Sequence, residues 1–295
     1  MIRTPLRYPG GKSILTDFFI ELFRFNNMHD VVYSEPYAGG AGAAINLLLS
    51  NSVNRILIND ANIGIYSFWK AVVEETDRFI DAIQNCEVTL NEWRRWKCVF
   101  RTATEPSFEL GFATFFLTRT NRSGVLNAGP IGGVTDAQQA EAQYKIDCRF
   151  NKQVLVEKVK NIGARATDIE VSNLDALDFL RQNNMRDRLF VYLDPPYFQQ
   201  GKSLYMDYYK REDHQILANY LTNDAQFVWI LSYDNVEEIR NMYSTFPLYE
   251  YNLNYSVRTV RHGKELLLHS AQINLPEYLI VKGNDPKAKL KYHLI

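Results

Sequence analysis

The chain has 295 residues, of which 46% are apolar and 23% charged, a composition that is typical of folded globular proteins and excludes a disordered chain. No apolar run reaches membrane-spanning length and the first residues lack a signal-peptide core, so we expect a cytoplasmic protein without membrane contact. The net charge of −1 excludes a globally basic surface, but residues 90–165 hold 12 Lys and Arg against 7 Asp and Glu, which makes this segment the candidate polyanion face.

Three widely spaced cysteines, with no closely paired set, indicate a reducing compartment and no metal site. The N-terminal residues Gly10-Gly11-Lys12-Ser13 resemble a phosphate loop, but Leu6 stands where that loop requires glycine, and no strand precedes it. Lys12 instead begins an amphipathic helix, where a cation can meet a ligand carboxylate. The alternative is an ordinary turn with a solvated lysine.

A strand over residues 31–34 leads into the glycine-rich turn 35–42 and then into a helix over 43–49. A second strand, over residues 55–60, ends in Asp60, which lies 20 residues after Gly40. That offset is typical of Rossmann-type sites, where the carboxylate binds ribose hydroxyls and the glycines allow close backbone approach. The combination indicates a site for a nucleoside-containing cofactor.

Helical patterns dominate the middle of the chain, over residues 63–85, 90–102, 108–120 and 151–164. This stretch is too long for a simple crossover between strands. We therefore expect a smaller helical domain, residues 62–165, inserted into a sheet domain made of residues 1–61 and 166–295. In the helix over 90–102, Arg94 and Lys97 lie on a basic face opposite aromatic residues. That face is either simply solvated or a contact for phosphates.

Residues 119–133 form a glycine-rich polar loop or hairpin without a long apolar face. Arg and Asn side chains can recognise base edges, and an apolar side chain can fill a gap in a base stack. The candidate DNA-binding residues here are Arg119, Asn121, Arg122, Ser123, Val125 and Asn127. The alternative is a flexible connector.

The apolar run 189–192 predicts a buried strand that ends in Asp194-Pro195-Pro196-Tyr197. The two prolines force a sharp exit from the strand, so a carboxylate, backbone carbonyls and an aromatic ring are held at its C-terminal end. In open α/β sheets, that edge is where ligands bind. By itself, the pattern also fits a plain strand end.

The rest of the C-terminal part reads as alternating strands and helices. Strands are predicted over 169–172, 227–231, 248–252 and 277–281, helices over 174–182 and 213–222, and a lid over 199–213. Asp175 lies near the start of the first helix. Arg258 and Arg261 belong to a basic loop, a further candidate DNA contact, although an ordinary solvated hairpin fits as well. We expect residues 284–295 to be a loosely held tail.

Four motifs in this order, LRYPGGK, EPYAGGAG, ILIND and LDPPY, with a helical insertion before the last, resemble the Dam-type DNA adenine methyltransferases of the D12 class. The resemblance implies a Rossmann-like α/β sheet of seven strands, the class I methyltransferase fold, with an inserted target-recognition domain. It also implies S-adenosylmethionine as methyl donor and double-stranded DNA as substrate, with methylation of the 6-amino group of a flipped-out adenine.

Carried over by motif, the donor would contact Tyr8, Lys12, the turn of Tyr37, Ala38, Gly39 and Gly40, then Asp60, Asp175 and Asp194. The catalytic set would be Asp194, Pro195, Pro196 and Tyr197, with Asp194 between donor and target base and Tyr197 stacked on that base. Relatives that recognise GATC resemble NRxxYNGLxR in the loop, whereas this chain has NRSGVLN, with Asn127 at the arginine position. Recognition of GATC is therefore not implied.

Two alternatives stay open from the sequence. The first is an amino-methyltransferase that acts on RNA or protein, and the second is a non-catalytic DNA-binding homologue. The retained Lys12, Asp60 and Asp194 argue against the second. We expect a monomer or a weak dimer.

Overall fold

The computed structural model describes every residue except 1–2, 199–208, 258, 278, 281–288 and 291–292, so most of the predicted lid lies outside the described residues. Among the described residues, the larger sheet has eight strands, all but one of them four residues or longer. In spatial order they are β3 (Ile169–Ser172), β2 (Arg55–Asn59), β1 (Val32–Glu35), β4 (Leu189–Leu193), β5 (Val228–Asp234), β7 (Thr259–His269), β6 (Tyr249–Val257) and β10 (His293–Leu294). The mixed α/β sheet is compatible with the expected methyltransferase fold.

The first five strands in this order run parallel, and β7, β6 and β10 continue the sheet antiparallel. The chain winds outward from β1 to β2 and β3 and then crosses back, so that β4 pairs with the other side of β1. Parallel sheets of this type have their ligand crevice where the winding changes direction. This topology places the crevice between the C-terminal ends of β1 and β4.

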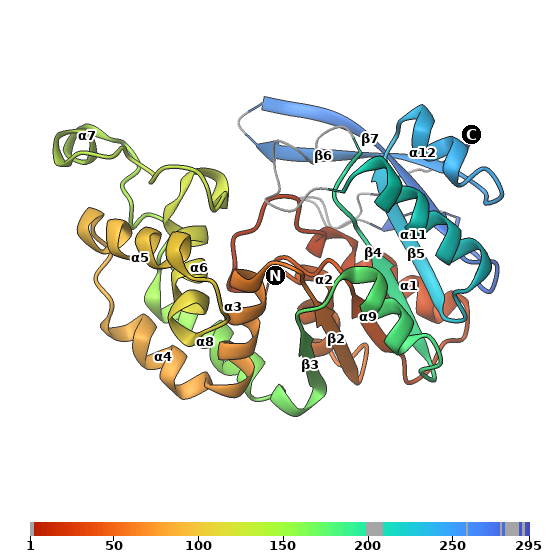
Figure 1. Cartoon of the computed structure of the whole chain (residues 1–295), viewed down its shortest axis with the longest axis horizontal. Coiled ribbons are helices and arrows are strands. Elements are labelled where there is room, and N and C mark those ends of the chain that lie inside the picture. Colours follow the sequence, from red (N-terminus) through yellow and green to blue (C-terminus); the bar gives the residue numbers. More distant parts are fainter. Residues whose placement is uncertain (1–2, 199–208, 258, 278, 281–288, 291–292) are drawn as a thin grey trace.

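Helices cover both faces of the sheet (Figure 1). Side chains alternate along β4, with Phe190 and Tyr192 in one apolar cluster and Val191 and Leu193 in the other. The first cluster includes α1 (Thr16–Phe25) and α2 (Gly42–Leu49). The second includes α9 (Ala176–Asn183), α11 (Arg211–Asn223) and α12 (Glu237–Met242). Because both faces of β4 are apolar, the strand is buried on both sides, as its continuous apolar sequence indicated.

Between β2 and β3 the chain forms six α-helices, which gather on one side of the sheet in Figure 1. They are α3 (Ile63–Glu74), α4 (Thr76–Asn85), α5 (Leu90–Thr102), α6 (Phe108–Thr120), α7 (Asp136–Glu141) and α8 (Lys152–Gly163). Asn62, Thr89 and Ser107 cap the N-termini of α3, α5 and α6 with their side chains, which explains where these helices begin. The helices predicted over 90–102, 108–120 and 151–164 are confirmed. The helix predicted over 63–85 is divided at Glu75 into α3 and α4, and α7 was not predicted.

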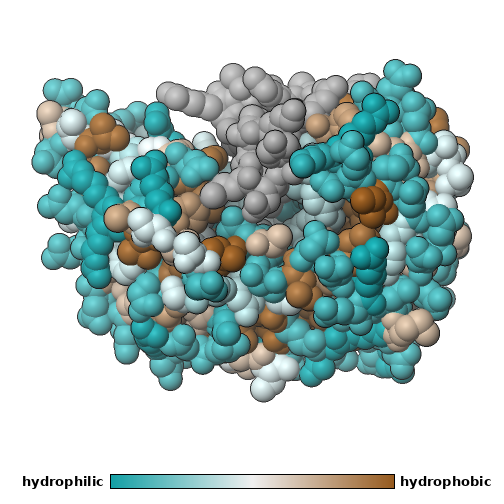
Figure 2. All heavy atoms as spheres, in the orientation of Figure 1, coloured by the Kyte–Doolittle hydropathy of each residue, from teal (hydrophilic) through white to brown (hydrophobic). Residues whose placement is uncertain are grey.

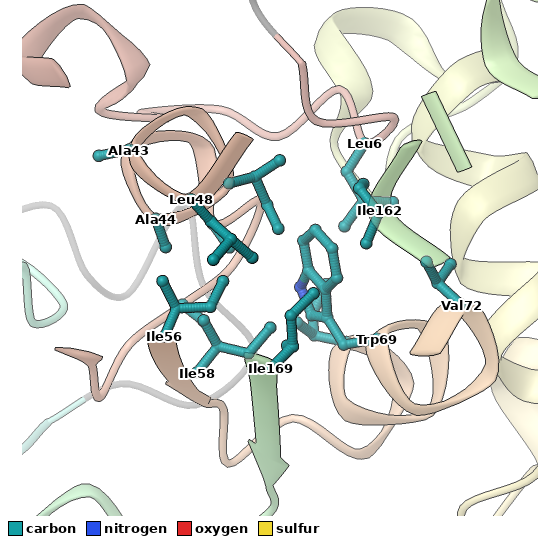
Figure 3. Close-up of a cluster of buried hydrophobic side chains, with 14 of the residues drawn as sticks. Leu6, Ala43, Ala44, Leu48, Ile56, Ile58, Trp69, Val72, Ile162 and Ile169 are labelled. Atoms are coloured by element: carbon teal, nitrogen blue, oxygen red, sulfur yellow. The ribbon is translucent and has the colours of Figure 1, made fainter. Parts of the chain in front are cut away.

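The helices of the insertion share their apolar core with the sheet. Figure 3 shows Trp69 of α3 close to Ile169 of β3 and Ile162 of α8, with Ile56 and Ile58 of β2 nearby. Fully buried side chains such as Trp69 contribute on the order of 1.5–3 kcal/mol each through burial alone. The division into a sheet domain and a recognition domain remains a prediction, and one continuous core crosses the proposed boundary.

Three predicted elements differ from the structure. Residues 119–133 form no strand hairpin, because a 3₁₀ turn (η2, Arg122–Gly124) and a single bridge between Asn121 and Pro130 close the loop instead. The stretch around Arg261, predicted as a loop, belongs to β7. Of the strand expected over 277–281, the described part is β8 (Leu279–Ile280), which pairs with β9 (Lys289–Leu290) outside the larger sheet.

The expected loose tail also contributes β10, which pairs with β6. In the part of the chain that the structure describes, no helix has both the length and the apolar character needed to cross a bilayer. The face shown in Figure 2 is mainly polar, with apolar residues in scattered spots.

Candidate active site

A cavity of about 270 Å³ lies at the C-terminal ends of β1, β2 and β4. This volume is close to the lower end of ordinary ligand pockets, roughly 300 Å³. All nine residues predicted to contact the cofactor line it, namely Tyr8, Lys12, Tyr37, Ala38, Gly39, Gly40, Asp60, Asp175 and Asp194. Pro196 also lines it, and Pro195 is buried beside it. The structure therefore brings together motifs that are far apart in the sequence.

The glycine-rich turn is held in place from three sides. Gly39 adopts a φ of +45°, and a Cβ there would lie 2.7 Å from the Tyr8 ring, so this position needs glycine. The Gly39 amide donates to Asp60 at 2.8 Å, and the Trp69 indole donates to the Gly39 carbonyl at 2.9 Å. Asp60 also accepts from the Asn62 amide at 2.9 Å. Asp60 thus shapes the turn in addition to facing the cavity.

The outer parts of the cavity contain a tyrosine pair and an acid. The hydroxyl groups of Tyr37 and Tyr209 lie 2.7 Å apart, which connects the turn to the chain that precedes α11. Asp175 is exposed and caps α9 by accepting from the Leu177 amide at 2.9 Å. Tyr37 and Asp175, which were both predicted to contact a cofactor, therefore already form hydrogen bonds within the protein.

Asp194 stands at the end of β4 beside a buried cation. The Lys12 ammonium lies 3.0 Å from the Asp194 carboxylate and 3.7 Å from that of Glu265, and it donates to the Tyr197 hydroxyl at 2.9 Å. The Tyr197 hydroxyl in turn donates to Glu265. Among the described contacts, two carboxylates thus share one ammonium at this end of the sheet.

Burial changes the protonation of these groups. Burial, together with the charge of Glu265, raises the pKa of Asp194 to about 6 against the opposing effect of Lys12. Burial alone would lower the pKa of Lys12, but the carboxylates of Asp194 and Glu265 outweigh it and raise that pKa well above its usual range. Asp194 is therefore ionised at neutral pH, and Lys12 is a cation.

Glu35, at the end of β1, is a buried acid of a different kind. Burial raises its pKa to about 8, even though it accepts from the Ala44 amide at 2.9 Å and the Tyr33 hydroxyl at 3.1 Å. It is therefore largely neutral at pH 7, and it fixes the N-terminus of α2 rather than adding charge. The sequence analysis did not single out this residue, although it opens the EPYAGGAG motif.

The model of the D12 class N6 adenine-specific DNA methyltransferase family matches residues 8–257. The chain belongs to this family. The matched range contains EPYAGGAG, ILIND and LDPPY, and it begins at Tyr8, inside LRYPGGK.

A curated relative of this D12-class chain, "Modification methylase StsI" from Streptococcus sanguinis, is 23% identical over 308 aligned positions. The alignment covers 97% of this chain but only 43% of that relative, so the chain spans less than half of its length. Among solved structures, protein LPL1258 from Legionella pneumophila str. Philadelphia 1 aligns over 98% of both chains at 10% identity. Its TM-score is 0.35, and we base no argument on it.

The loop 121–130 of this D12-class chain reaches the cavity. Gly124, Val125, Leu126 and Asn127 all line it. Gly124 has a φ of +74°, and a Cβ there would lie 2.0 Å from the Arg7 carbonyl oxygen. The Arg7 guanidinium donates to the Asn121 carbonyl at 3.2 Å. The loop is therefore fastened onto the N-terminal segment that carries the LRYPGGK motif.

Two of the predicted DNA-binding side chains are buried beneath this loop. Asn121 is fully buried, donates to the carbonyls of Val125 and Leu126 at 2.9 and 3.0 Å, and accepts from the Trp93 indole at 2.7 Å. Lys97 is 5% exposed and donates to the Leu126 carbonyl. This corrects the expectation of direct DNA contact, because a tight loop leaves carbonyls that need donors and these side chains supply them.

The remaining candidates on and near the loop are accessible. Arg94, Arg122, Ser123 and Asn127 are exposed, and Val125 is half-buried. Ser123 has a φ of +56°, which turns the chain sharply at the outer end of the loop. Their contact with DNA stays a prediction.

Arg119 belongs to a cluster of cations, defined here as Arg7, Arg119, Arg149 and Lys158. Arg119 donates to the Arg149 carbonyl, and Lys158 donates to the Thr4 carbonyl at 3.0 Å. Within the described residues, no acid forms an ion pair with any of the four. Burial and the charges of Arg7 and Arg149 lower the pKa of Arg119 to about 10. Arg7, Arg119 and Lys158 also line a second cavity, next to Tyr8.

The last two candidates are in the C-terminal part. Arg258 lies outside the described residues, and Arg261 is in β7 with its backbone paired to Tyr255. The prediction that Arg261 lies in a basic loop is therefore wrong. Because β7 was missed, so was Glu265, although the apolar run Leu266–Leu268 that follows it was a signal for a buried strand.

Proposed function

We propose that this protein methylates the exocyclic 6-amino group of adenine in DNA, with S-adenosylmethionine as the methyl donor and after flipping the base out of the duplex. The observation that carries the proposal is the position of Asp194 and the Pro195 carbonyl at the end of β4. Asp194 lines a cavity that Lys12, Asp60 and the glycine-rich turn also line, and the buried Pro195 follows it directly in the chain. Family membership supports the same reaction.

The cavity has the chemistry that the donor requires. Asp60 offers carboxylate oxygens suited to ribose hydroxyls, Tyr8 and Tyr37 offer aromatic faces, and the Gly39–Gly40 backbone allows close approach. When bound, the donor supplies an electrophilic methyl group on a positively charged sulfur. The carboxylates of Asp194 and Glu265 lie at this end of the site, which suits a cationic ligand.

The residues of the chain itself act on the adenine amine. The lone pair of this nitrogen is delocalised into the ring, so the amine is a poor nucleophile. The Asp194 carboxylate and the Pro195 carbonyl can accept its two N–H hydrogens, which favours a tetrahedral nitrogen. Positive charge grows on this nitrogen as the methyl group is transferred, and a fixed anion beside it lowers the barrier. Holding the reacting atoms in line contributes several further kcal/mol, on the order of 7–11 at most.

The target base must leave the duplex to reach this edge of the sheet. Tyr197 follows the two prolines, and its hydroxyl is fixed by Lys12 and Glu265, so its ring is held in one orientation. We propose that the flipped adenine stacks on this ring, a contact worth about 1–3 kcal/mol. Arg94, Arg122, Ser123, Val125 and Asn127 would face the duplex, and the cluster of Arg7, Arg119, Arg149 and Lys158 would meet its phosphates.

The test is transfer of a labelled methyl group from the donor to duplex DNA, followed by digestion to nucleosides. We expect N6-methyladenine with DNA and no product with RNA or protein. Asp194→Ala should reduce the transfer rate by at least about 100-fold, because it removes the anion next to the developing charge. Binding of DNA should be retained.

The matched control is Asp178→Ala, since Asp178 is an exposed acid on α9. It should leave the rate unchanged. A normal rate in Asp194→Ala, or label only in RNA or protein, would refute the proposal. Sequencing modified bases in DNA from cells that express the protein would then identify the recognition sequence.

A further inference from the structure

Glu265 is a buried carboxylate at the candidate active site that none of the four motifs includes. It lies on β7 with 2% of its surface exposed, and its backbone pairs with Asp234 of β5 and Tyr251 of β6. It also lies beyond the residues that the family model matches. A buried carboxylate costs several kcal/mol unless donors compensate it, so its partners are informative.

The described partners of Glu265 connect it to the reacting end of the site. One carboxylate oxygen accepts from the Tyr197 hydroxyl and lies 3.7 Å from the Lys12 ammonium. The other accepts from the Tyr251 hydroxyl at 2.6 Å. Tyr251 is itself within 3.2 Å of the Ser232 hydroxyl on β5. The carboxylate is therefore anchored from β5 and β6 and acts on Tyr197 and Lys12.

The position of Lys12 decides how much of the Asp194 charge remains available. If Asp194 were the sole acid near Lys12, the pair would be neutral and its field on an incoming amine would be weak. With Glu265 present, the described contacts place one ammonium between two carboxylates, so Lys12 does not pair with Asp194 alone. Glu35 adds no further charge at neutral pH, since burial raises its pKa to about 8.

We propose that Glu265 is a positioning residue for methyl transfer, which fixes the Tyr197 hydroxyl and holds Lys12 between two carboxylates so that Asp194 stays a net anion toward the amine. The proposal rests on the proposed function for its effect on rate. Its electrostatic part concerns the ligand-free protein alone.

The first test is Glu265→Gln, which keeps the shape of the side chain but removes its charge. We expect the single-turnover transfer rate to fall about 10- to 100-fold, less than in Asp194→Ala. We also expect the acid limb of the pH–rate profile, set by ionisation of Asp194, to move to lower pH. The reason is that the charge of Glu265 contributes, after burial, to the rise of the Asp194 pKa to about 6 in the native protein, against the opposing effect of Lys12. Affinity for DNA should be unchanged.

Other groups also face Asp194, and their effects must stay constant in the comparison. They are Lys12, Glu35, Tyr33, Tyr192, Tyr197 and Tyr233. Glu265→Asp retains the charge on a shorter side chain, so it should lower the rate but leave the acid limb near its native position. Glu250→Gln, a buried acid on the neighbouring strand β6, serves as the matched control and should change neither quantity.

A second measurement separates this inference from the proposed function. Carbon-13 titration of the aspartate carboxyls, with Asp194 assigned through Asp194→Asn, needs neither DNA nor donor. The Asp194 pKa should fall in Glu265→Gln and not in Glu250→Gln. An unchanged Asp194 titration would overturn the inference whatever the enzyme's activity, whereas absence of methyl transfer by the native protein would overturn only the proposed function.

Discussion

Two groups of cations lie near the candidate active site, and they differ in whether an acid is their partner. Lys12 is buried and shared by the carboxylates of Asp194 and Glu265. Arg7, Arg119 and Lys158 donate to backbone carbonyls and, among the described residues, have no acid partner. A paired buried cation organises the site internally, whereas unpaired cations keep their field for an external anion. The contrast separates residues expected to govern folding and chemistry from residues expected to govern DNA affinity.

The largest effect should come from removing the paired cation. Lys12→Met removes the ammonium that the two buried carboxylates share, and breaking a buried ion pair by removing one partner typically costs about 3–5 kcal/mol. We expect a loss of that order in the free energy of unfolding at pH 8, measured by urea denaturation. Lys158→Met should lose less than about 1.5 kcal/mol, the value of one hydrogen bond. Equal losses of unfolding free energy in the two variants would contradict the expected difference between the paired and the unpaired cation.

A smaller effect is expected where the loop is fastened to the N-terminal segment. Gly124→Ala forces a positive φ on alanine and places a methyl group 2.0 Å from the Arg7 carbonyl oxygen. The strain is on the order of 1–3 kcal/mol and should displace the loop from the cavity. We expect weaker DNA binding with little change in the global melting temperature. The control Gly129→Ala should be milder, since its Cβ would meet only the flexible Arg122 guanidinium, at 3.1 Å.

The smallest effect concerns a single unpaired cation. If Lys158 meets a DNA phosphate, Lys158→Met should reduce the slope of log affinity against log salt by about 1. A purely structural role, through the Thr4 carbonyl, would leave this slope unchanged. Lys160→Met on the exposed side of the same helix is the matched control. An unaltered slope in Lys158→Met would remove this residue from the proposed phosphate contacts.

The catalytic edge could be predicted from the sequence because its residues belong to short motifs at strand ends. Asp60 and Asp194 each follow an apolar strand, and parallel strands bring their C-terminal ends to one edge. Local sequence therefore suffices for Asp194 and the glycine-rich turn, whereas Lys12 was placed through the resemblance, since its own motif also fits an ordinary turn. The helices over 90–102, 108–120 and 151–164 could also be predicted, and in the structure the side chains of Thr89, Ser107 and Asn151 cap them.

The burial of polar side chains in and beneath the loop 121–130 was harder to predict, because a polar side chain is not always exposed. Asn121 and Lys97 are polar residues, yet the side chains of both donate hydrogen bonds to carbonyls of the loop itself. Glu265 was missed for the converse reason. The basic residues around Arg261 suggested a loop, although they belong to strand β7. The apolar part of this strand begins directly after Glu265. Lys97 and Glu265 have partners far along the chain, whereas Asn121 donates to carbonyls only four and five residues further on.

The hydrogen bond from the Trp69 indole to the Gly39 carbonyl has a practical consequence for protein engineering. Trp69 belongs to α3, the first helix of the insertion, but it supports the floor of the pocket in the sheet. A chimera that receives the whole insertion of a relative would exchange this support together with the loop. Grafting a new sequence preference should therefore keep α3 native and splice only downstream of it.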